Sequence, residues 1–133
     1  MTARIVRDGD MYTLRVGKGS RTQFKVETVI SHEKKQLGLS GRPNLPDGTG
    51  MLFIFDELGR QGMWMIDMKF PLDIVWLDEQ FTIVHLSLNC PPCPNAGQCP
   101  TYSSRFRVKY AIEMTAGQAA AYGFEVGKQL FVI

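Results

Sequence analysis

The 133-residue sequence predicts a mainly β protein, a β-rich α+β fold in which one small sheet closes or nearly closes into a barrel beside two short helices. About eight short segments either alternate apolar and polar residues or form apolar runs of strand length. Turn residues separate these segments, and the two helical segments are too short to cover a sheet. We therefore expect a barrel or sandwich rather than a doubly wound sheet.

Length and composition are those of one globular domain, which we expect to span residues 1–133. Hydrophobic residues make up 44% of the chain and charged residues 21%, values that argue against disorder. Lysine and arginine exceed aspartate and glutamate by 15 − 13 = 2, and the charges are scattered. A dispersed excess of this size does not form the basic surface that nucleic-acid binding requires.

Strand signals dominate the first half of the chain. Residues 11–16 and 24–29 alternate apolar and polar side chains around a glycine-rich turn, which predicts an antiparallel pair. Residues 42–50 contain two prolines and three glycine or asparagine turn formers, so we expect an irregular connection. The continuous apolar run at 51–55 suits a strand buried on both faces, and residues 63–66 resume strand character.

A short surface helix is predicted between the second and third strands, at residues 31–37. Ser31 is a good N-cap, and Gly38 fits a helix stop. The helix is mostly polar, so we expect it on the surface with Leu37 and Leu39 as its apolar anchors.

The second half continues the β pattern. Residues 67–71 end in a proline and predict a bend, bulge or edge segment. Residues 73–77 and 82–86 flank a polar turn and predict a hairpin. Residues 108–114 return to strand spacing after a proline-rich loop.

The C-terminal region predicts a second short helix followed by a last strand. Thr115 and Gln118 match a capping box, three alanines follow at 119–121, and Gly123 can close the helix. The final residues 129–133 are so apolar that we expect a strand inserted in the sheet.

Three cysteines lie in or beside the proline-rich loop. The Cys90 to Cys93 spacing is that of a redox motif, but prolines rather than helix formers follow, so we reject that interpretation. Cys93 and Cys99 are favoured as a disulfide that closes the loop, with Cys90 left over. A zinc site that adds His85 to the three cysteines, or three free thiols in a reducing compartment, remain alternatives.

Several motifs stand at specific separations along the chain. They are Gly38-Leu39, Arg42, Leu45-Pro46, Gly50-Met51-Leu52-Phe53-Ile54-Phe55, Trp64-Met65, Pro71-Leu72-Asp73-Ile74, Glu113 and Ala116-Gly117. Together they resemble the domain-of-unknown-function 192 family over residues 24–133. The resemblance implies a compact β-rich fold, an origin in bacteria or archaea, frequent export or membrane tethering, and a biochemical role that is not established.

This chain departs from the family pattern at two places. Ile66-Asp67-Met68 stands where the family usually has Lys-Asn-Thr, and Ser40 stands where it often has Met. No role of that lysine or threonine is therefore carried over to this chain.

The polar residues attached to the resembling motifs are the candidates for a ligand site. Asp73 lies inside an apolar run, where a buried carboxylate needs a partner, so we expect Arg42 or main-chain amides near the Pro71 bend to hold it. A structural role for Asp73 is favoured over a place in a ligand pocket. The ligand-binding candidates are Arg42, Trp64, Asp67, Asp73 and Glu113.

Methionine and tryptophan side chains gather in the central third of the chain. Thioethers and flat aromatic rings can form an adaptable ligand surface, but they fill irregular cores equally well, and core filling is favoured. Strong exposure of Trp64 would favour a binding surface. The set comprises Met51, Met63, Met65, Met68, Trp64 and Trp76.

The first hypothesis for function is a non-catalytic ligand-binding or accessory module with a pocket formed by Arg42, Trp64, Asp67 and Asp73. The alternatives are a small metal-assisted hydrolase that uses Asp67 and Asp73, and a structural or partner-docking domain without a pocket. We assign no catalytic residue, no metal ligand and no cofactor. The expected partner is an unknown small molecule or protein, and no nucleic acid.

The sequence leaves the cellular compartment open. It contains no apolar run long enough to cross a membrane, and residues 1–11 lack the apolar stretch of a signal peptide. We expect a soluble protein, cytoplasmic if Met1 is the natural start and exported if a leader has been removed.

Overall fold

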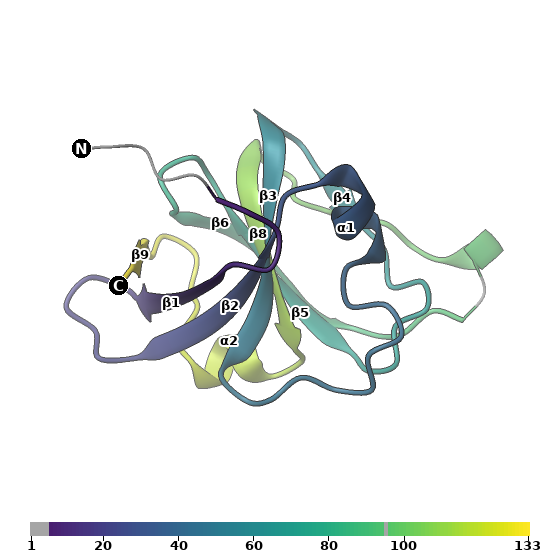
Figure 1. Cartoon of the computed structure of the whole chain (residues 1–133), viewed down its shortest axis with the longest axis horizontal. Coiled ribbons are helices and arrows are strands. Elements are labelled where there is room, and N and C mark those ends of the chain that lie inside the picture. Colours follow the sequence, from purple (N-terminus) through teal and green to yellow (C-terminus); the bar gives the residue numbers. More distant parts are fainter. Residues whose placement is uncertain (1–5, 95) are drawn as a thin grey trace.

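The computed structural model describes residues 6–94 and 96–133. Nine strands, two short α-helices and a 3-10 turn follow one another along the chain (Figure 1). They are β1 (Met11–Val16), β2 (Gln23–Val29), α1 (His32–Leu37), β3 (Thr49–Gly59), β4 (Gly62–Met63), β5 (Leu72–Leu77), β6 (Ile83–Cys90), η1 (Ala96–Gln98), β7 (Tyr102–Ser103), β8 (Val108–Thr115), α2 (Gln118–Ala121) and β9 (Leu130–Val132).

Seven of these strands form one strongly curled, half-barrel sheet in the order β6-β5-β8-β3-β2-β1-β9, and β4 pairs with β7 in a separate ribbon. The two edges of the large sheet meet at one end, where Thr82 and Gln129 form an antiparallel bridge. Beside this bridge, the Ile83 amide donates to the Lys128 carbonyl at 2.8 Å. The prediction of a mainly β fold with a nearly closed sheet and two short helices is confirmed.

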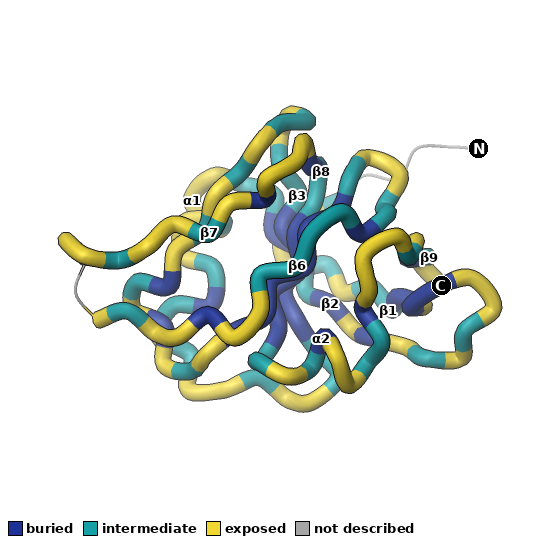
Figure 2. Tube along the Cα trace, turned by 180° about the vertical axis from the view of Figure 1, so that it is seen from behind, coloured by how far each residue is buried: buried dark blue, intermediate teal, exposed yellow. Residues whose placement is uncertain are grey.

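The curled sheet separates two apolar clusters because side chains alternate along each strand. The first cluster draws residues from all seven strands of the sheet and includes Ala119 of α2. The second lies on the opposite face, beneath α1 and the segments that follow α1 and β4. Strand β5 is buried at all six positions because it supplies Val75 and Leu77 to the first cluster and Ile74 and Trp76 to the second. Figure 2 shows the buried positions running through the central strands.

The first helix and its cap are confirmed, but one of its two expected anchors is wrong. The Ser31 hydroxyl accepts a hydrogen bond from the Lys34 amide at 3.3 Å, as an N-cap does. Leu39 is buried, whereas Leu37 is 55% exposed. None of the residues of α1 is buried, so the helix is attached to the sheet mainly through the segment that follows it.

The strand expected at residues 63–66 is largely absent. Regular pairing ends at Met63, and Ile66 forms only an isolated bridge with Cys93. The reason is a tight turn at Asp67, whose φ is +62°, together with the amides of Met68 and Cys93, which both donate to the Met65 carbonyl. These turn hydrogen bonds occupy the Met65 carbonyl, so residues 64–66 do not continue the pairing of β4.

The capping box expected at the second helix is wrong, and Asp73 replaces it. Strand β8 runs through Thr115, so the N-cap falls at Gly117, which has φ +94° and no side chain. The buried Asp73 carboxylate instead accepts from the amides of Gly117 at 2.9 Å and Ala119 at 3.1 Å. It also accepts from the Asn89 amide at 3.0 Å.

The last strand forms, but at an edge rather than inside the sheet. Strand β9 stands at the end of the strand order and pairs with β1, while on its other side the Leu130 amide donates to the Phe81 carbonyl at 2.9 Å. Val132 and Ile133 are therefore more than half exposed. The hairpin expected between residues 73–77 and 82–86 is present as β5 and β6.

The predicted disulfide is present between Cys93 and Cys99, whose Cα atoms lie 5.7 Å apart. The cysteine left over, Cys90, is buried within the second apolar cluster. Burial, and then the charges of Asp73 and Glu113, raise the pKa of its thiol to about 11. With two of the three sulfurs joined to each other, the zinc set of His85 and three cysteines is not formed.

Cysteine accessibility gives a first test of this arrangement. Iodoacetamide applied to the folded, unreduced protein is expected to leave the mass unchanged, because Cys90 is buried and its thiolate is scarce. The denatured, unreduced chain should take up one adduct, and the denatured and reduced chain should take up three. Two adducts on the folded protein would show that the disulfide is not formed.

Replacing Asp73 by Asn tests the cap of α2. The amide nitrogen of Asn cannot accept a hydrogen bond, so at least one buried main-chain amide loses its partner, and the negative charge is lost as well. We expect the free energy of unfolding to fall by about 2–3 kcal/mol in urea denaturation. Asp67→Asn, at an exposed position, is the matched control and should change it little. Equal stability of both variants would contradict the role of Asp73.

Candidate ligand-binding cavity

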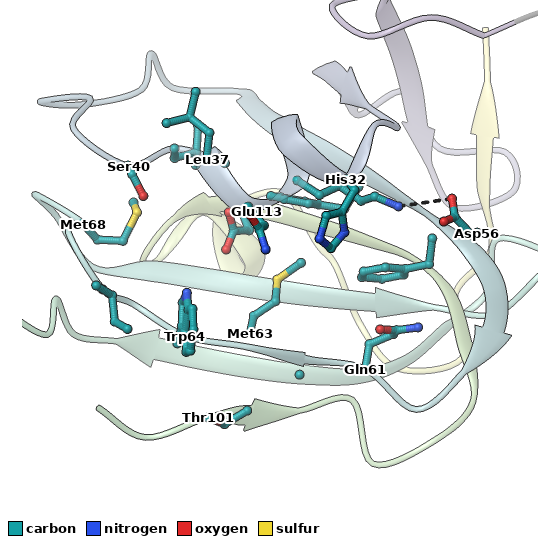
Figure 3. Close-up of a pocket in the computed structure, with 18 of the residues that line it drawn as sticks. His32, Leu37, Ser40, Asp56, Gln61, Met63, Trp64, Met68, Thr101 and Glu113 are labelled. Atoms are coloured by element: carbon teal, nitrogen blue, oxygen red, sulfur yellow. Dashed lines mark hydrogen bonds and ion pairs between the residues drawn. The ribbon is translucent and has the colours of Figure 1, made fainter. Parts of the chain in front are cut away.

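A cavity of about 680 Å³ lies on the second apolar face, between α1 and the segment that contains β4. Its lining comes from residues 32 and 35–40, from residues 53 and 55–57 of β3, and from residues 61–64, 66 and 68, with Thr101 and Glu113. Figure 3 shows the side chains of α1 along one side of the cavity and those of Met63 and Trp64 along the other. The cavity is therefore built by segments that lie outside the curled sheet, over a floor made by the sheet.

Glu113 is the polar group of that floor. Side chains alternate along β8, so Ile112 and Met114 enter the first apolar cluster while Ala111 and Glu113 face the second. Glu113 lies across from Met51 of β3 and Ile74 of β5, both of them apolar. The residue is only 5% exposed, yet it lines the cavity.

Among the described residues, none forms an ion pair or a side-chain hydrogen bond with the Glu113 carboxyl group, in contrast to Asp73. Burial raises the pKa of Glu113 to about 8, because the ionised form loses its hydration without gaining a partner. At pH 7 the carboxyl group is therefore mostly protonated. It can donate one hydrogen bond, or it can ionise when a positive charge arrives.

Lys35 is the basic side chain of the cavity wall, and it is already engaged. Its ammonium group donates to the carbonyl of Ile54 at 3.0 Å and lies 3.5 Å from the Asp56 carboxylate. It also lies 5.8 Å from the centroid of the Phe55 ring. These contacts hold Lys35 at the end of the cavity where Asp56 lies (Figure 3).

Trp64 stands at the mouth of the cavity with 61% of its surface exposed. Of the other methionine and tryptophan residues in the set, some line the cavity and the rest fill the core. Met63 is half-buried and lines the cavity, and Met68 lines it from a buried position. Met51, Met65 and Trp76 fill the second apolar cluster. The exposure of Trp64 favours a binding surface at this one end of the set.

The remaining site candidates lie elsewhere. Arg42 forms an ion pair with Glu27 at 2.9 Å and lines a separate cavity of about 220 Å³. Asp67 is exposed and does not line the main cavity, although both of its neighbours in sequence do. Asp73 is bound to main-chain amides. Of the five candidates, the structure brings together Trp64 and Glu113.

Sequence reasoning missed the contribution of α1 and of the end of β3. Lys35 and Phe55 come from these elements; Lys35 belongs to no motif that resembles the family, and Phe55 ends one but was not named as a site residue. A signal was present for Phe55, because it continues the alternation of Phe53 toward a polar end of the strand. No signal identified Lys35, because nothing in a six-residue polar helix shows which side faces the sheet.

The described residues offer no set of metal ligands: none of their His, Cys, Asp and Glu side chains form a group of three or more that could hold an ion. In addition, Asp73 uses both carboxylate oxygens to accept main-chain hydrogen bonds. Within residues 6–94 and 96–133, no helix has the length and apolar character needed to cross a bilayer.

The fold and the cavity together define a small β-rich protein in which a curled seven-stranded sheet carries one ligand-sized hollow on its outer segments. The chain belongs to the DUF192 family, described as "Uncharacterized ACR", whose model matches residues 13–132. The sequence motifs suggested a start at residue 24, but the family model already matches from residue 13, so β1 is part of the family fold.

Two solved structures share this fold. A Sinorhizobium meliloti protein, proposed to be a transcription regulator, is 26% identical and superposes with a TM-score of 0.84, over 96% of this chain and 97% of its own. A protein of unknown function from Novosphingobium aromaticivorans is 22% identical with a TM-score of 0.81, over 91% of this chain and 84% of its own. No curated protein sequence matches the chain.

The raised pKa of Glu113 predicts a pH dependence of stability. The folded protein holds the Glu113 proton up to about pH 8, whereas the unfolded chain releases it near 4.5, the ordinary value for Glu. The stabilising contribution is therefore complete below pH 4.5 and is lost as the pH rises to 8. We expect the free energy of unfolding of the native chain to fall over this range relative to that of Glu113→Gln.

The comparison with Glu113→Gln cancels the histidines, which titrate in the same range. Burial lowers the pKa of His85, an effect of opposite sign that is common to both proteins. Glu79→Gln, in the exposed turn between β5 and β6, is the matched control and should show a constant difference from the native chain. A constant difference for Glu113→Gln as well would mean that the carboxyl group ionises as an exposed one does.

Proposed function

We propose that this chain is a non-catalytic binding module that holds a small organic molecule in the cavity above Glu113. The observation that carries the proposal is Glu113 at the floor of that cavity, a residue with 5% exposure whose carboxyl group has no partner among the described residues. The Glu113 oxygens are open to the cavity, so a ligand there can supply the hydrogen-bond partner that the described part of the fold does not. An arrangement of this kind is expected where a bound molecule completes the structure.

The size and lining of the cavity support a small-molecule ligand. Pockets for small molecules are about 300–1,000 Å³, with mostly apolar walls and a few polar groups that fix orientation. This cavity has about 680 Å³, with Phe53, Met63 and Met68 among its apolar lining. Glu113 would supply the orienting group and Trp64 a flat apolar face at the entrance.

The hydrolase alternative has less support. It requires converging carboxylates with perturbed pKa values, whereas the cavity lining has one carboxyl group with a raised pKa. Asp67 and Asp73, the residues it would use, do not line the cavity. Its metal would also need ligands that the described residues do not group together.

The similarity to a Sinorhizobium protein proposed to be a transcription regulator does not enter the proposal. The net charge of this chain is +2, and its basic residues are dispersed along the sequence. Nucleic-acid binders gather Lys and Arg on one face to neutralise phosphates. We therefore keep nucleic acid out of the expected partners.

A fragment screen tests the binding function. Small aromatic fragments, neutral and charged, are added one at a time while the melting temperature is measured, since a molecule that binds only the native state raises it. The indole N–H signals in ¹H–¹⁵N spectra then locate the site. Because Trp64 lines the cavity and Trp76 is buried in the core, we expect bound fragments to shift the Trp64 signal more strongly.

Trp64→Ala should weaken fragment binding by about tenfold, the equivalent of about 1.4 kcal/mol. Phe106→Ala removes a similarly exposed aromatic side chain that does not line the cavity and should leave the affinity unchanged. A screen in which no fragment raises the melting temperature or moves the Trp64 signal would refute the binding function.

A further inference from the structure

We infer that the cavity selects organic cations, specifically a protonated amine carried on an apolar body, and that Glu113 is the counter-charge for the amine. This inference rests on the proposed binding function and names its ligand class. It follows from the balance of charges in the cavity, from the isolation of Glu113 and from the aromatic wall.

The described lining of the cavity is acidic. Asp56, Glu57 and Glu113 contribute carboxyl groups, and Lys35 is the only lysine or arginine among the described residues of the lining. Lys35 lies 3.5 Å from Asp56, so this pair is internally balanced. The carboxyl groups of Glu57 and Glu113 remain without a basic partner in the lining, which favours a positively charged ligand.

The environment of Glu113 separates the possible ligand classes. A protonated amine would supply both the missing positive charge and N–H donors, giving a charge-assisted hydrogen bond in a site of low dielectric. A neutral alcohol could form only an ordinary hydrogen bond with the protonated acid. An anionic ligand would add a second negative charge beside a carboxyl group that already resists ionisation. The expected order of affinity is cation, then neutral molecule, then anion.

The wall of the cavity already binds one ammonium group in the required way. Lys35 lies over the Phe55 ring while donating to a main-chain carbonyl and pairing with a carboxylate. Trp64 presents a larger and more exposed aromatic surface in the same lining, and indole is the strongest cation-binding ring. The apolar body of an amine ligand would contact Met63 and Phe53.

Binding of a cation is coupled to release of a proton. Protonated Glu113 and the ammonium ion form a carboxylate–ammonium pair, and the carboxyl proton passes to the buffer, so that charge balances. With a pKa of about 8, Glu113 is mostly protonated at pH 7, so most of one proton is released per amine bound.

Other ionisable groups line the cavity with Glu113 or interact with its charge. Within the described part of the chain, neither His32 nor Lys35 forms an ion pair with Glu113, and the Cys90 thiol stays protonated through neutral pH because its pKa is about 11. These groups are His32, Lys35, Asp56, Glu57, Asp73 and Cys90.

The experiment compares three probes of nearly equal shape: phenethylamine, 2-phenylethanol and phenylacetate. Calorimetric titrations at pH 7 in two buffers with different ionisation enthalpies give the affinity and the number of protons released. We expect the amine to bind at least about tenfold more tightly than the alcohol, with release of most of one proton, and the acid to bind most weakly.

Two variants locate the effect. Glu113→Gln should remove both the preference for the amine and the proton release, whereas Glu79→Gln, the same substitution in an exposed turn, should keep both. If Glu113→Gln does not fold, proton release by the native chain still decides the matter, because an alcohol-like binding mode releases none.

The outcomes separate this inference from the function on which it rests. Equal binding of amine and alcohol without proton release would overturn the cation preference and leave the binding module intact. Tight amine binding that survives in Glu113→Gln would also overturn it. Failure of the amine to bind at millimolar concentration would overturn it as well, and the neutral fragments of the broader screen would then decide whether the cavity binds anything.

Discussion

One carboxylate connects the segments that complete the sheet. Asp73, in the most buried strand, accepts hydrogen bonds from main-chain amides of the β6 end and of the α2 start, which are 16, 44 and 46 residues away in sequence. A buried charge is tolerated when it receives several such bonds. In return, it satisfies an amide at the irregular end of β6, where Asn89 has φ +53°, and caps a helix that has no capping side chain of its own. The alignment of β5, β6 and α2 depends on this one group.

The neighbouring strand carries a buried acid of the opposite kind. Glu113 and Asp73 lie on paired strands, but Asp73 is surrounded by amide donors and Glu113 by apolar side chains and a cavity. Burial alone therefore does not distinguish a structural acid from a candidate binding acid. The distinction comes from the hydrogen-bond partners. Those of Asp73 are main-chain amides of the protein, whereas a partner for Glu113 would have to be a bound molecule.

The strands were largely predictable because alternation and turn residues are local properties of the sequence. The strand at Met11–Val16 was placed at its observed bounds, and the Cys93–Cys99 pairing followed from the loop that it closes. The errors arose where a distant residue overrides a local pattern, as at Thr115, whose capping box yields to the carboxylate of Asp73. For the same reason, Trp64 and Glu113 were predicted as site residues from separate motifs, whereas the side of the cavity that α1 forms was not predicted. The sequence of a short polar helix does not indicate which of its faces lines a cavity.

The strand order has a consequence for synthesis on the ribosome. Strands β3 and β5 do not pair with each other, because β8 lies between them, and β8 (Val108–Thr115) is synthesised after both. The centre of the sheet can therefore assemble only once β8 has left the exit tunnel, and until then the apolar faces of β3 and β5 lack their partner strand. A polypeptide truncated before β8 would retain the aggregation-prone strands and lack the strand that unites them.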